Sequence, residues 1–246
     1  MRLYHSVCAL NTIFTVADIL IGVVFMNLPK AHELFDLSHT IAKEIFDGVE
    51  YPFEALPKIK ELVIKLSATL PKDEYTEISD GVFVANDAKI SDKATILPPT
   101  IIGHGTEVRP GAFIRGSVLV GDGAVIGNST EVKNAVIFDG AQLPHYNYVG
   151  DSILGYKAHL GAGAVISNFK LDHSSVNVSK DGEKLNTGLR KFGALMGDFA
   201  ESGCNSVINP GTIIGRNTVI YPLTSLRGVI PESSIVHNDG SIVKKR

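Results

Sequence analysis

The chain has 246 residues, long enough for one large domain or a domain with an appendage, and 44% of them are hydrophobic, enough to form a buried core. The net charge of −3 and the absence of a long Lys/Arg run argue against a nucleic-acid partner, and the lack of Trp disfavours a base-stacking platform. Cys8 and Cys204 are too far apart for a disulfide framework or a metal-binding spacing, which favours a reducing cytoplasm.

Residues 1–25 form an apolar extension that needs a separate interpretation. The stretch from Val7 to Met26 is about long enough to span a bilayer, but Asp18 lies inside it. A central Asp costs roughly 2.5–3.5 kcal/mol on insertion scales. Three alternatives stay open: a start upstream of the true start at Met26, a membrane anchor, and a cleaved signal or extra packed helix. A membrane partner is expected only if the extension is an anchor.

Residues 26–75 are predicted to form a two-helix segment that packs against or caps the next domain. The first helix is indicated by apolar residues at helical spacing, with Gly48 after them: Leu34, Leu37, Ile41 and Ile45. The second helix begins near Pro57 and ends at Pro71. Its apolar face is made by Ile59, Leu62, Val63, Leu66 and Leu70.

From residue 84 the hydrophobic period becomes six. Neither an α-helix nor an alternating strand repeats every six residues, so the pattern predicts an all-β solenoid over residues 80–232, with the repeated aliphatic side chains inside. The first inward series is Val84, Ile90, Ile96, Ile102, Val108, Ile114, Val120, Ile126 and Val132. Three hexads make one triangular coil, which gives about seven coils in all.

The six-residue phase then slips twice and is interrupted once. It slips by one residue to reach Ile137, and again to reach Leu154. The polar stretch at about 169–190 contains Asp181-Gly182 and is predicted to be a loop or hairpin that leaves the solenoid. The repeat resumes at Met196, and residues 233–246 are expected to form a polar tail.

Side chains beside the interruption are candidates for chemistry. His145 lies at a phase slip, and a neutral imidazole is a natural base near pH 7. Arg109 and Lys133 point outward and offer a phosphate a guanidinium fork and a point charge. Asn168 stands where the repeat breaks, and its amide can hydrogen-bond a substrate. Each residue also has a plainer interpretation without a role in chemistry: His145 as a surface histidine, Arg109 and Lys133 as solvated surface charges, and Asn168 as a turn residue.

Several ungapped motifs then carry a family resemblance. Residues 107–112 (EVRPGA), 127–135 (GNSTEVKNA), 145–151 (HYNYVGD), 160–163 (LGAG) and Asn168 resemble the acetyltransferase domain of bacterial N-acetylglucosamine-1-phosphate uridyltransferase/glucosamine-1-phosphate acetyltransferase. Residues 187–194 (TGLRKFGA), with Asn205 and Pro210-Gly211, are more similar to related sugar-phosphate nucleotidyltransferase/acetyltransferases, including archaeal ones. The match covers roughly residues 84–231.

This resemblance implies a left-handed parallel β-helix that assembles as a homotrimer, with acetyl-CoA as co-substrate and no metal requirement. It implies that His145 is the general base. Substrate binding is implied for Arg109, Lys133, Tyr148, His159, Asn168 and, if the alignment is anchored at Thr187, Lys184. Contacts to the coenzyme are implied for Ala162, Cys204 and Pro222.

Some positions depart from the family pattern. His159 stands where the family has an Asn, and Phe169 replaces a Tyr. Cys204 and Pro222 stand where small residues usually line the coenzyme groove. No Gly-rich phosphate loop or βαβ pattern precedes the repeat, so nucleotidyl transfer is not expected of this chain.

The sequence therefore predicts a cytoplasmic N-acetyltransferase that acts on an amino-sugar phosphate in nucleotide-sugar metabolism, such as the route to UDP-N-acetylglucosamine. The alternative is a non-catalytic trimer that binds nucleotide sugars or acts as a scaffold. A γ-class carbonic anhydrase shares the solenoid but needs three metal-binding histidines, two of them close in sequence, and no pair among the eight histidines has that spacing.

Overall fold

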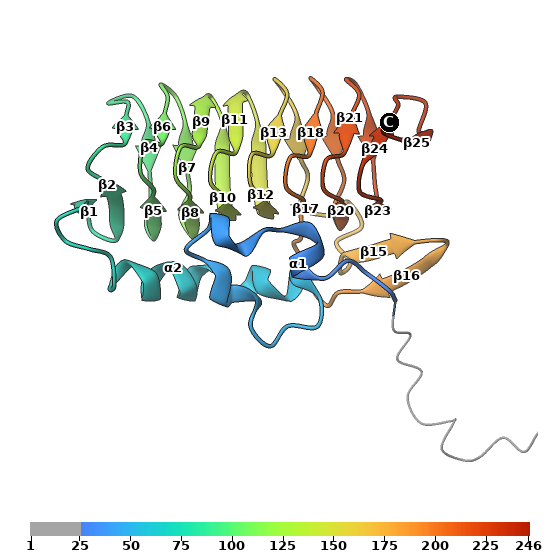
Figure 1. The fold of residues 1–246 in the computed structure, drawn as a ribbon, viewed down its shortest axis with the longest axis horizontal. Coiled ribbons are helices and arrows are strands. Elements are labelled where there is room, and N and C mark those ends of the chain that lie inside the picture. Colours follow the sequence, from blue (N-terminus) through green and yellow to red (C-terminus); the bar gives the residue numbers. More distant parts are fainter. Residues whose placement is uncertain (1–25) are drawn as a thin grey trace, which may run out of the picture.

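The computed structural model describes residues 26–246, and the apolar extension at residues 1–25 lies outside the described part. The described chain forms a long three-sided solenoid with a helical arm along one side (Figure 1). Strands of equivalent position pair in parallel from one coil to the next. The solenoid predicted from the six-residue period is confirmed, with seven complete coils and part of an eighth.

Each coil contributes one short strand to each of three faces, named here in chain order. The first face contains β2 (Val82–Ala85), β5 (Thr100–Ile102), β8 (Val118–Val120), the second halves of β10 (Glu131–Ile137) and β12 (Tyr148–Leu154), β17 (Ala194–Met196), β20 (Thr212–Ile214) and β23 (Val229–Ile230).

The second face contains β3 (Lys89–Ile90), β6 (Glu107–Val108), β9 (Val125–Asn128), β11 (Gln142–His145), β13 (His159–Leu160), β18 (Glu201–Ser202), β21 (Val219–Ile220) and β24 (Ser234–Val236). The third face contains β4 (Thr95–Ile96), β7 (Phe113–Ile114), the first halves of β10 and β12, β14 (Val165–Ile166), β19 (Val207–Ile208) and β22 (Ser225–Leu226). The first corner follows the first face, the second corner the second face, and the third corner the third face.

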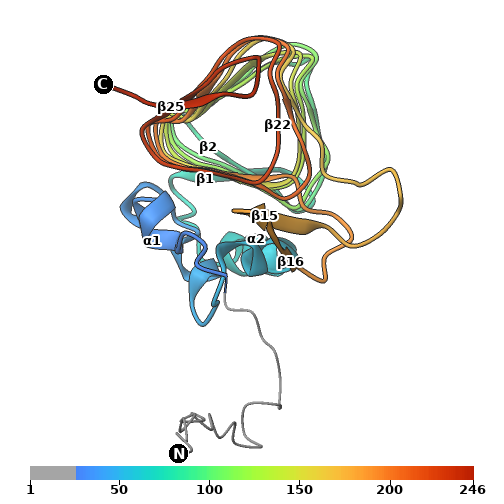
Figure 2. The same cartoon turned by 90° about the vertical axis from the view of Figure 1, so that its right-hand side faces the viewer.

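The winding of the chain is left-handed. Figure 2 views the solenoid from the end where the chain finishes, so later coils lie nearer the viewer. The chain runs clockwise from β22 at the right, through the first face below, toward β25 (Ile242–Lys244) at the left. A clockwise path that approaches the viewer is a left-handed helix, an exception to the right-handed rule for parallel crossovers.

The interior of the solenoid is made by the side chains of the six-residue period. Ile102, Ile126 and Ile166 are fully buried, as are their equivalents in most coils. Packing is tight at the corners as well. A Cβ on Gly127 would lie 1.7 Å from the carbonyl oxygen of Pro144 in the next coil, so only glycine fits there.

The two phase slips have a backbone cause at the third corner. β10 and β12 each run through this corner as one continuous strand, one residue shorter than a regular hexad. The turn is made by Asn134 and Asp151, whose φ angles are 43° and 49°. Asn and Asp tolerate this left-handed conformation better than other side chains.

The arm differs in detail from the predicted helices. In place of a first continuous helix, the chain forms α1 (Ala31–Leu34) and two 3₁₀ turns, η2 (Leu37–His39) and η3 (Lys43–Phe46). Ile41 is 48% exposed, so the predicted apolar face is not continuous. The second helix consists of η4 (Pro52–Lys58) and α2 (Ile59–Ser67).

The arm packs along the outside of the first face (Figures 1 and 2). Outward side chains of that face form a second apolar cluster with the arm: Ile101, Leu119, Val136, Ile153, Leu195 and Ile213. The arm's fully or nearly buried contributions include Phe35, Phe53, Leu56, Ile59 and Val63. Both sides of the first face are therefore buried, which is why its strands read as continuous apolar runs.

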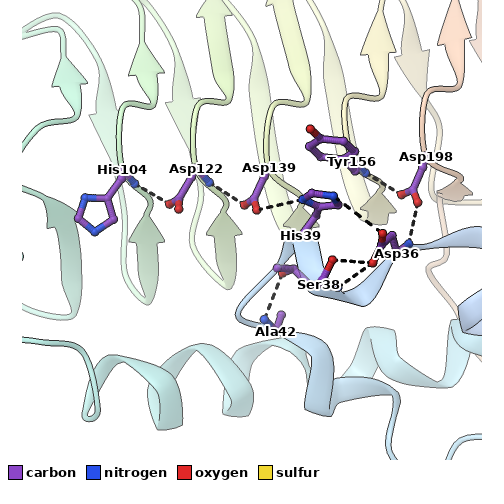
Figure 3. Close-up of polar contacts among 10 residues, drawn as sticks. Asp36, Ser38, His39, Ala42, His104, Asp122, Asp139, Tyr156 and Asp198 are labelled. Atoms are coloured by element: carbon purple, nitrogen blue, oxygen red, sulfur yellow. Dashed lines mark hydrogen bonds and ion pairs between the residues drawn. The ribbon is translucent and has the colours of Figure 1, made fainter.

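Polar contacts fix the arm at the first corner (Figure 3). The backbone N–H of Asp36 donates to Asp198 Oδ2 at 2.6 Å, and the Asp198 N–H donates to the Leu34 carbonyl at 3.0 Å. The His39 ring stacks on Tyr156 with 3.6 Å between centroids.

Two segments complete the described chain. The interruption of the repeat contains a hairpin of β15 (Asn177–Lys180) and β16 (Glu183–Asn186). The hairpin lies against the first face near β20 and β23, further along the solenoid than α2 (Figure 1). The C-terminal stretch is not only a tail, because β24 continues the second face and β25 pairs with it antiparallel. β1 (Tyr75–Ser79) pairs antiparallel with β2 at the other end. Within residues 26–246, no helix is long and apolar enough to cross a membrane.

Candidate functional site

The second corner brings four predicted site residues into one line. The carbonyl of His145 accepts the N–H of Gly163, next to Ala162, at 3.0 Å. The carbonyl of Ala162 in turn accepts the N–H of Asn205, next to Cys204, at 2.9 Å. The carbonyl of Cys204 accepts the N–H of Leu223, next to Pro222, at 2.9 Å. Paired strands lie about 4.8 Å apart. His145, Ala162, Cys204 and Pro222 therefore form a row parallel to the solenoid axis.

The backbone around His145 is held by a buried side chain. Asn147 is only 2% exposed, and its Oδ1 accepts the His145 N–H at 3.2 Å. Its Nδ2 donates to the carbonyls of Gly161 at 2.8 Å and Ala164 at 3.2 Å in the next coil. Tyr146 completes the turn with a φ of 52°. The position of His145 is thus tied to the coil that carries Ala162.

The imidazole of His145 is itself exposed at the end of β11. Within residues 26–246 it makes no hydrogen bond or ion pair with its own chain. An unpaired ring nitrogen at the surface is able to accept a proton from a bound molecule. Cys204 is an exposed free thiol on the same corner.

The third corner holds a second, more buried polar cluster, built around Asp151. The side chains of Lys133 and Asp151 are 18% and 10% exposed, and Lys133 Nζ lies 3.2 Å from Asp151 Oδ2. Asn134 Nδ2 donates to Asp151 Oδ1 at 2.9 Å, and Asn168 Nδ2 donates to Asp151 Oδ2. Lys133, Asp151 and Asn168 come from successive coils and stack at one corner, and Lys133 and Asn168 are the two predicted site residues among them.

Tyr148 lies between the two corners, on the outer side of the third face. Its side chain is half-buried, and burial raises the pKa of its hydroxyl, with the charges of Glu131 and Asp151 adding to the shift. The hydroxyl and the Asn168 amide both approach Gly150. A Cβ on Gly150 would lie 2.5 Å from Asn168 Nδ2 and 2.8 Å from the Tyr148 hydroxyl oxygen. Glycine is therefore needed for this arrangement of Tyr148 and Asn168.

A single chain does not bring all the predicted residues together. His145 and the cluster around Asp151 occupy different corners, six residues apart along the chain and separated by the third face. Arg109 lies on the second corner, two coils before His145, and its Nη2 is 3.1 Å from Glu107 Oε2. The row at the second corner and the cluster at the third corner are thus two separate surfaces of one molecule.

His159 and Lys184 lie elsewhere. His159 points outward on the second face, paired in register with Gln142 and Glu201, and lines a shallow depression of about 420 Å³. Lys184 is exposed on β16, on the hairpin beside the first face. Among residues 26–246, neither residue forms a hydrogen bond or ion pair with His145 or Asn168.

Sequence reasoning did not select Asp151 or Asn134. The phase slips were the available signal, because a hexad that loses one residue needs a left-handed turn residue at a corner. Both residues take that role. The Asn134 side chain then donates to Asp151, and the Asp151 carboxylate contacts Lys133 and Asn168.

A cavity of about 370 Å³ lies between the arm and the first corner, away from these residues. His104 Nδ1 is 3.0 Å from Asp87 Oδ1, and His104 Nε2 is 3.3 Å from Glu74 Oε2. Burial raises the pKa of Tyr75 to about 12, and nearby carboxylates, Asp122 first among them, add to this.

The carboxylates of the first corner accept hydrogen bonds from backbone N–H groups (Figure 3). Asp122 Oδ1 accepts the His104 N–H at 2.7 Å, and Asp139 Oδ1 accepts the Asp122 N–H at 2.8 Å. Asp198 Oδ1 accepts the Tyr156 N–H at 2.8 Å. These contacts identify the first corner as a structural seam under the arm. In the described part of the chain, His, Cys, Asp and Glu side chains form no group of three or more that would hold a metal ion.

Comparison with known proteins agrees with the sequence motifs. The family model described as "GMPPB C-terminal domain" matches residues 96–183. The bifunctional sugar-1-phosphate nucleotidylyltransferase/acetyltransferase of Sulfurisphaera tokodaii is 36% identical over 150 residues, 61% of this chain and 37% of that protein. The bifunctional protein GlmU of Methanococcus maripaludis is 29% identical over 225 residues, 89% of this chain and 54% of that protein.

These relatives confirm the resemblance to bifunctional sugar-phosphate nucleotidyltransferase/acetyltransferases. The chain spans 37% of the first relative and 54% of the second. Among solved structures, a hexapeptide transferase family protein from Anaplasma phagocytophilum aligns with a TM-score of 0.45 and 17% identity, over 68% of this chain and 81% of that one.

Proposed function

We propose that this chain is an acetyl-CoA-dependent acyltransferase whose acceptor is an amino-sugar phosphate of the glucosamine 1-phosphate type. The observation that carries the proposal is the row at the second corner. The imidazole of His145 is exposed and has no hydrogen-bond or ion-pair partner among residues 26–246. It lies one coil from Ala162, and Cys204 and Pro222 continue the line. A thioester laid along this corner would present its acyl carbon close to a base.

The proposed reaction is a direct transfer. His145 accepts a proton from the acceptor amine as the amine nitrogen attacks the thioester carbonyl. Backbone N–H groups near Ala162 stabilise the oxyanion that forms. The C–S bond then breaks, an amide is formed, and the proton passes from His145 to the departing thiolate of coenzyme A. A positioned base of this kind contributes typically about 10²–10⁴-fold in rate.

The acceptor would be held by side chains of the third corner and by Arg109. Asn168 and Tyr148 offer hydrogen bonds to the sugar, and Lys133 and Arg109 offer positive charge to its phosphate. His159 and Lys184 belong to the same set in the family resemblance, on surfaces further from His145.

The proposed assembly is a homotrimer. The arm occupies the first face, which leaves the second and third faces and their corners available to other copies. Placing the second corner of one copy against the third face of its neighbour would complete a site that one chain holds in two halves. A cytoplasmic location is proposed, because acetyl-CoA is available there.

The test is a thiol-release assay with purified protein, acetyl-CoA and a panel of amino-sugar 1-phosphates, free amino sugars and neutral sugars. Release of coenzyme A that requires one acceptor, together with a product heavier by one acetyl group, supports the proposal and identifies the acceptor. No release across the panel, from protein shown by light scattering to be a folded trimer, contradicts it. That result would favour the non-catalytic sugar-nucleotide-binding module, which the departures at Cys204 and Pro222 also fit.

A further inference from the structure

Asn147 is a buried amide at a corner position that the other coils fill with smaller residues. The strand register aligns Asn147 with Thr130 in the preceding coil and with Ala164 in the next. In further coils the same position holds Ala112, Ser206 and Thr224. All these residues are 2% exposed or less. An amide has its acceptor and its donor on separate atoms, so Asn147 is able to hold two backbone groups at once.

The two backbone groups that Asn147 holds lie on either side of the proposed reaction. Its Oδ1 accepts the N–H of His145, the proposed base, at 3.2 Å. Its Nδ2 donates to the Gly161 carbonyl at 2.8 Å and to the Ala164 carbonyl at 3.2 Å. The Gly161 carbonyl belongs to the peptide group that links Gly161 to Ala162. One side chain therefore connects the backbone of the base to the peptide group that begins the coenzyme row.

The contact with the Gly161 carbonyl sets the direction of the Ala162 N–H. The C=O and N–H of a trans peptide group point in opposite directions. Because the Gly161 carbonyl points inward at Asn147, the Ala162 N–H is turned outward. Among residues 26–246 this N–H has no hydrogen-bond acceptor, and Ala162 is partly exposed. The Ala162 N–H is therefore available to an oxygen atom of a molecule bound along the row.

We propose that Asn147 is a positioning residue that holds the His145 backbone and directs the Ala162 N–H at the carbonyl oxygen of the thioester. The inference rests on the proposed acyltransferase function and names one backbone donor for its oxyanion. Negative charge develops on the carbonyl oxygen as the amine attacks, and losing one such donor lowers kcat by about 10²–10³-fold. The uncharged thioester gains less from the same contact, so its loss should affect kcat more than KM.

The first variant is Asn147→Ala, which removes the amide at a position where Ala112 and Ala164 already fit the solenoid. It is assayed with acetyl-CoA and the acceptor found in the panel. The value of kcat should fall at least about tenfold, while the KM values for both substrates change by less than about threefold. An unchanged kcat overturns the proposal.

The rescue variant is Asn147→Ser. At the equivalent position two coils further on, the Ser206 hydroxyl donates to the Tyr221 carbonyl at 3.1 Å. Tyr221 corresponds to Gly161 in the strand register, so the hydroxyl of Asn147→Ser is able to hold the Gly161 carbonyl. The kcat of Asn147→Ser should be at least about threefold higher than that of Asn147→Ala. A serine variant that is no faster than the alanine variant overturns the proposal.

A thiocarbonyl substrate separates the loss of an oriented donor from a general structural defect. In acetyldithio-CoA a sulfur atom replaces the carbonyl oxygen, and sulfur is a weak hydrogen-bond acceptor, so this substrate gains little from the Ala162 N–H. The ratio of kcat for acetyl-CoA to kcat for acetyldithio-CoA should therefore fall at least about threefold in Asn147→Ala. A structural defect would lower both rates together, and a ratio within about twofold of the wild-type ratio overturns the proposal.

The matched control is Thr106→Ala at the first corner. The Thr106 hydroxyl donates to the Gly121 carbonyl at 2.6 Å and accepts the Ala124 N–H at 3.0 Å, so the variant loses contacts of the same kind away from the row. Tm should fall in both alanine variants, but Thr106→Ala should keep kcat within about twofold of the wild type. An equal fall of kcat in the two variants overturns the proposal.

The wild-type rate separates failure of this inference from failure of the proposed function. Wild-type protein that turns over no acceptor contradicts the acyltransferase function and, with it, the role of Asn147. Wild-type turnover that Asn147→Ala retains in full contradicts the role of Asn147 alone.

Discussion

The attachment of the arm to the first face can be tested at Leu119. This side chain points away from the solenoid interior, yet it is fully buried, because it packs in the apolar cluster that the arm forms with the first face. On a bare solenoid it would be exposed, and replacing it would change stability by less than about 0.5 kcal/mol. Under the arm, Leu119→Ala removes buried methyl groups and leaves a cavity, which costs about 3 kcal/mol.

The assay is thermal unfolding followed by circular dichroism. In a domain of about 150–250 residues, each kcal/mol lowers Tm by about 2–4 °C, so Leu119→Ala should lower it by about 6–12 °C. Ile64→Ala is the matched control, since Ile64 is 50% exposed on α2 and should change Tm by under about 2 °C. Equal, small shifts for the two variants would refute the packing of the arm on this face.

Three further outcomes are expected. Burial opposes protonation of His104, but its hydrogen bond to Asp87 and the charges of Asp87, Asp122 and Glu74 outweigh this and raise its pKa. The stabilisation from protonated His104 is therefore complete below the ordinary histidine pKa near 6.5, and it is lost as pH rises through the raised pKa. His104→Gln should accordingly lower Tm more at pH 6 than at pH 9. An equal loss of Tm at both pH values would contradict this. The Ser202 hydroxyl is buried at an inward position and has no hydrogen-bond partner among residues 26–246. Ser202→Ala should therefore raise the free energy of unfolding, measured in urea, by about 1 kcal/mol. A loss of stability would argue against an unpaired hydroxyl. Gly150→Ala should lower kcat/KM for the acceptor at least about tenfold, because the added Cβ would displace the side-chain ends of Asn168 and Tyr148. Unchanged kinetics would exclude these two side chains from the acceptor site.

Much of the solenoid follows from the period of the sequence. An inward position every six residues can be satisfied only by short strands stacked coil on coil, and residues such as Ile102, Ile126 and Ile214 occupy the interior as expected. The interruption after Asn168 was equally visible, because its polar residues break the repeat.

The arm was predicted less well, for a physical reason. Its first part repeats apolar residues at helical spacing, but the first face forces the chain into short turns that insert Leu34 and Phe35 and leave Ile41 exposed. Tertiary packing overrides local propensity here. The apolar runs of the first face, such as Val118–Val120, were a signal that this face is covered on both sides.

The candidate site was only partly predictable. The row that contains His145 and Ala162 follows from coil spacing, since equivalent positions must stack. The pairing of Lys133 with Asp151 does not follow from spacing, because it depends on the left-handed turns that shorten the third corner. Partners across coils become visible only when the register of each corner is known.

The central claim, that His145 is the base of an acyl transfer, is tested most directly by single-turnover kinetics with saturating acetyl-CoA and the acceptor found in the panel. Because the imidazole is exposed and unpaired in the described chain, His145→Ala should leave Tm within about 1 °C of the wild type. The rate of amide formation should fall about 10²–10⁴-fold. A variant that transfers the acetyl group at the wild-type rate would contradict the account.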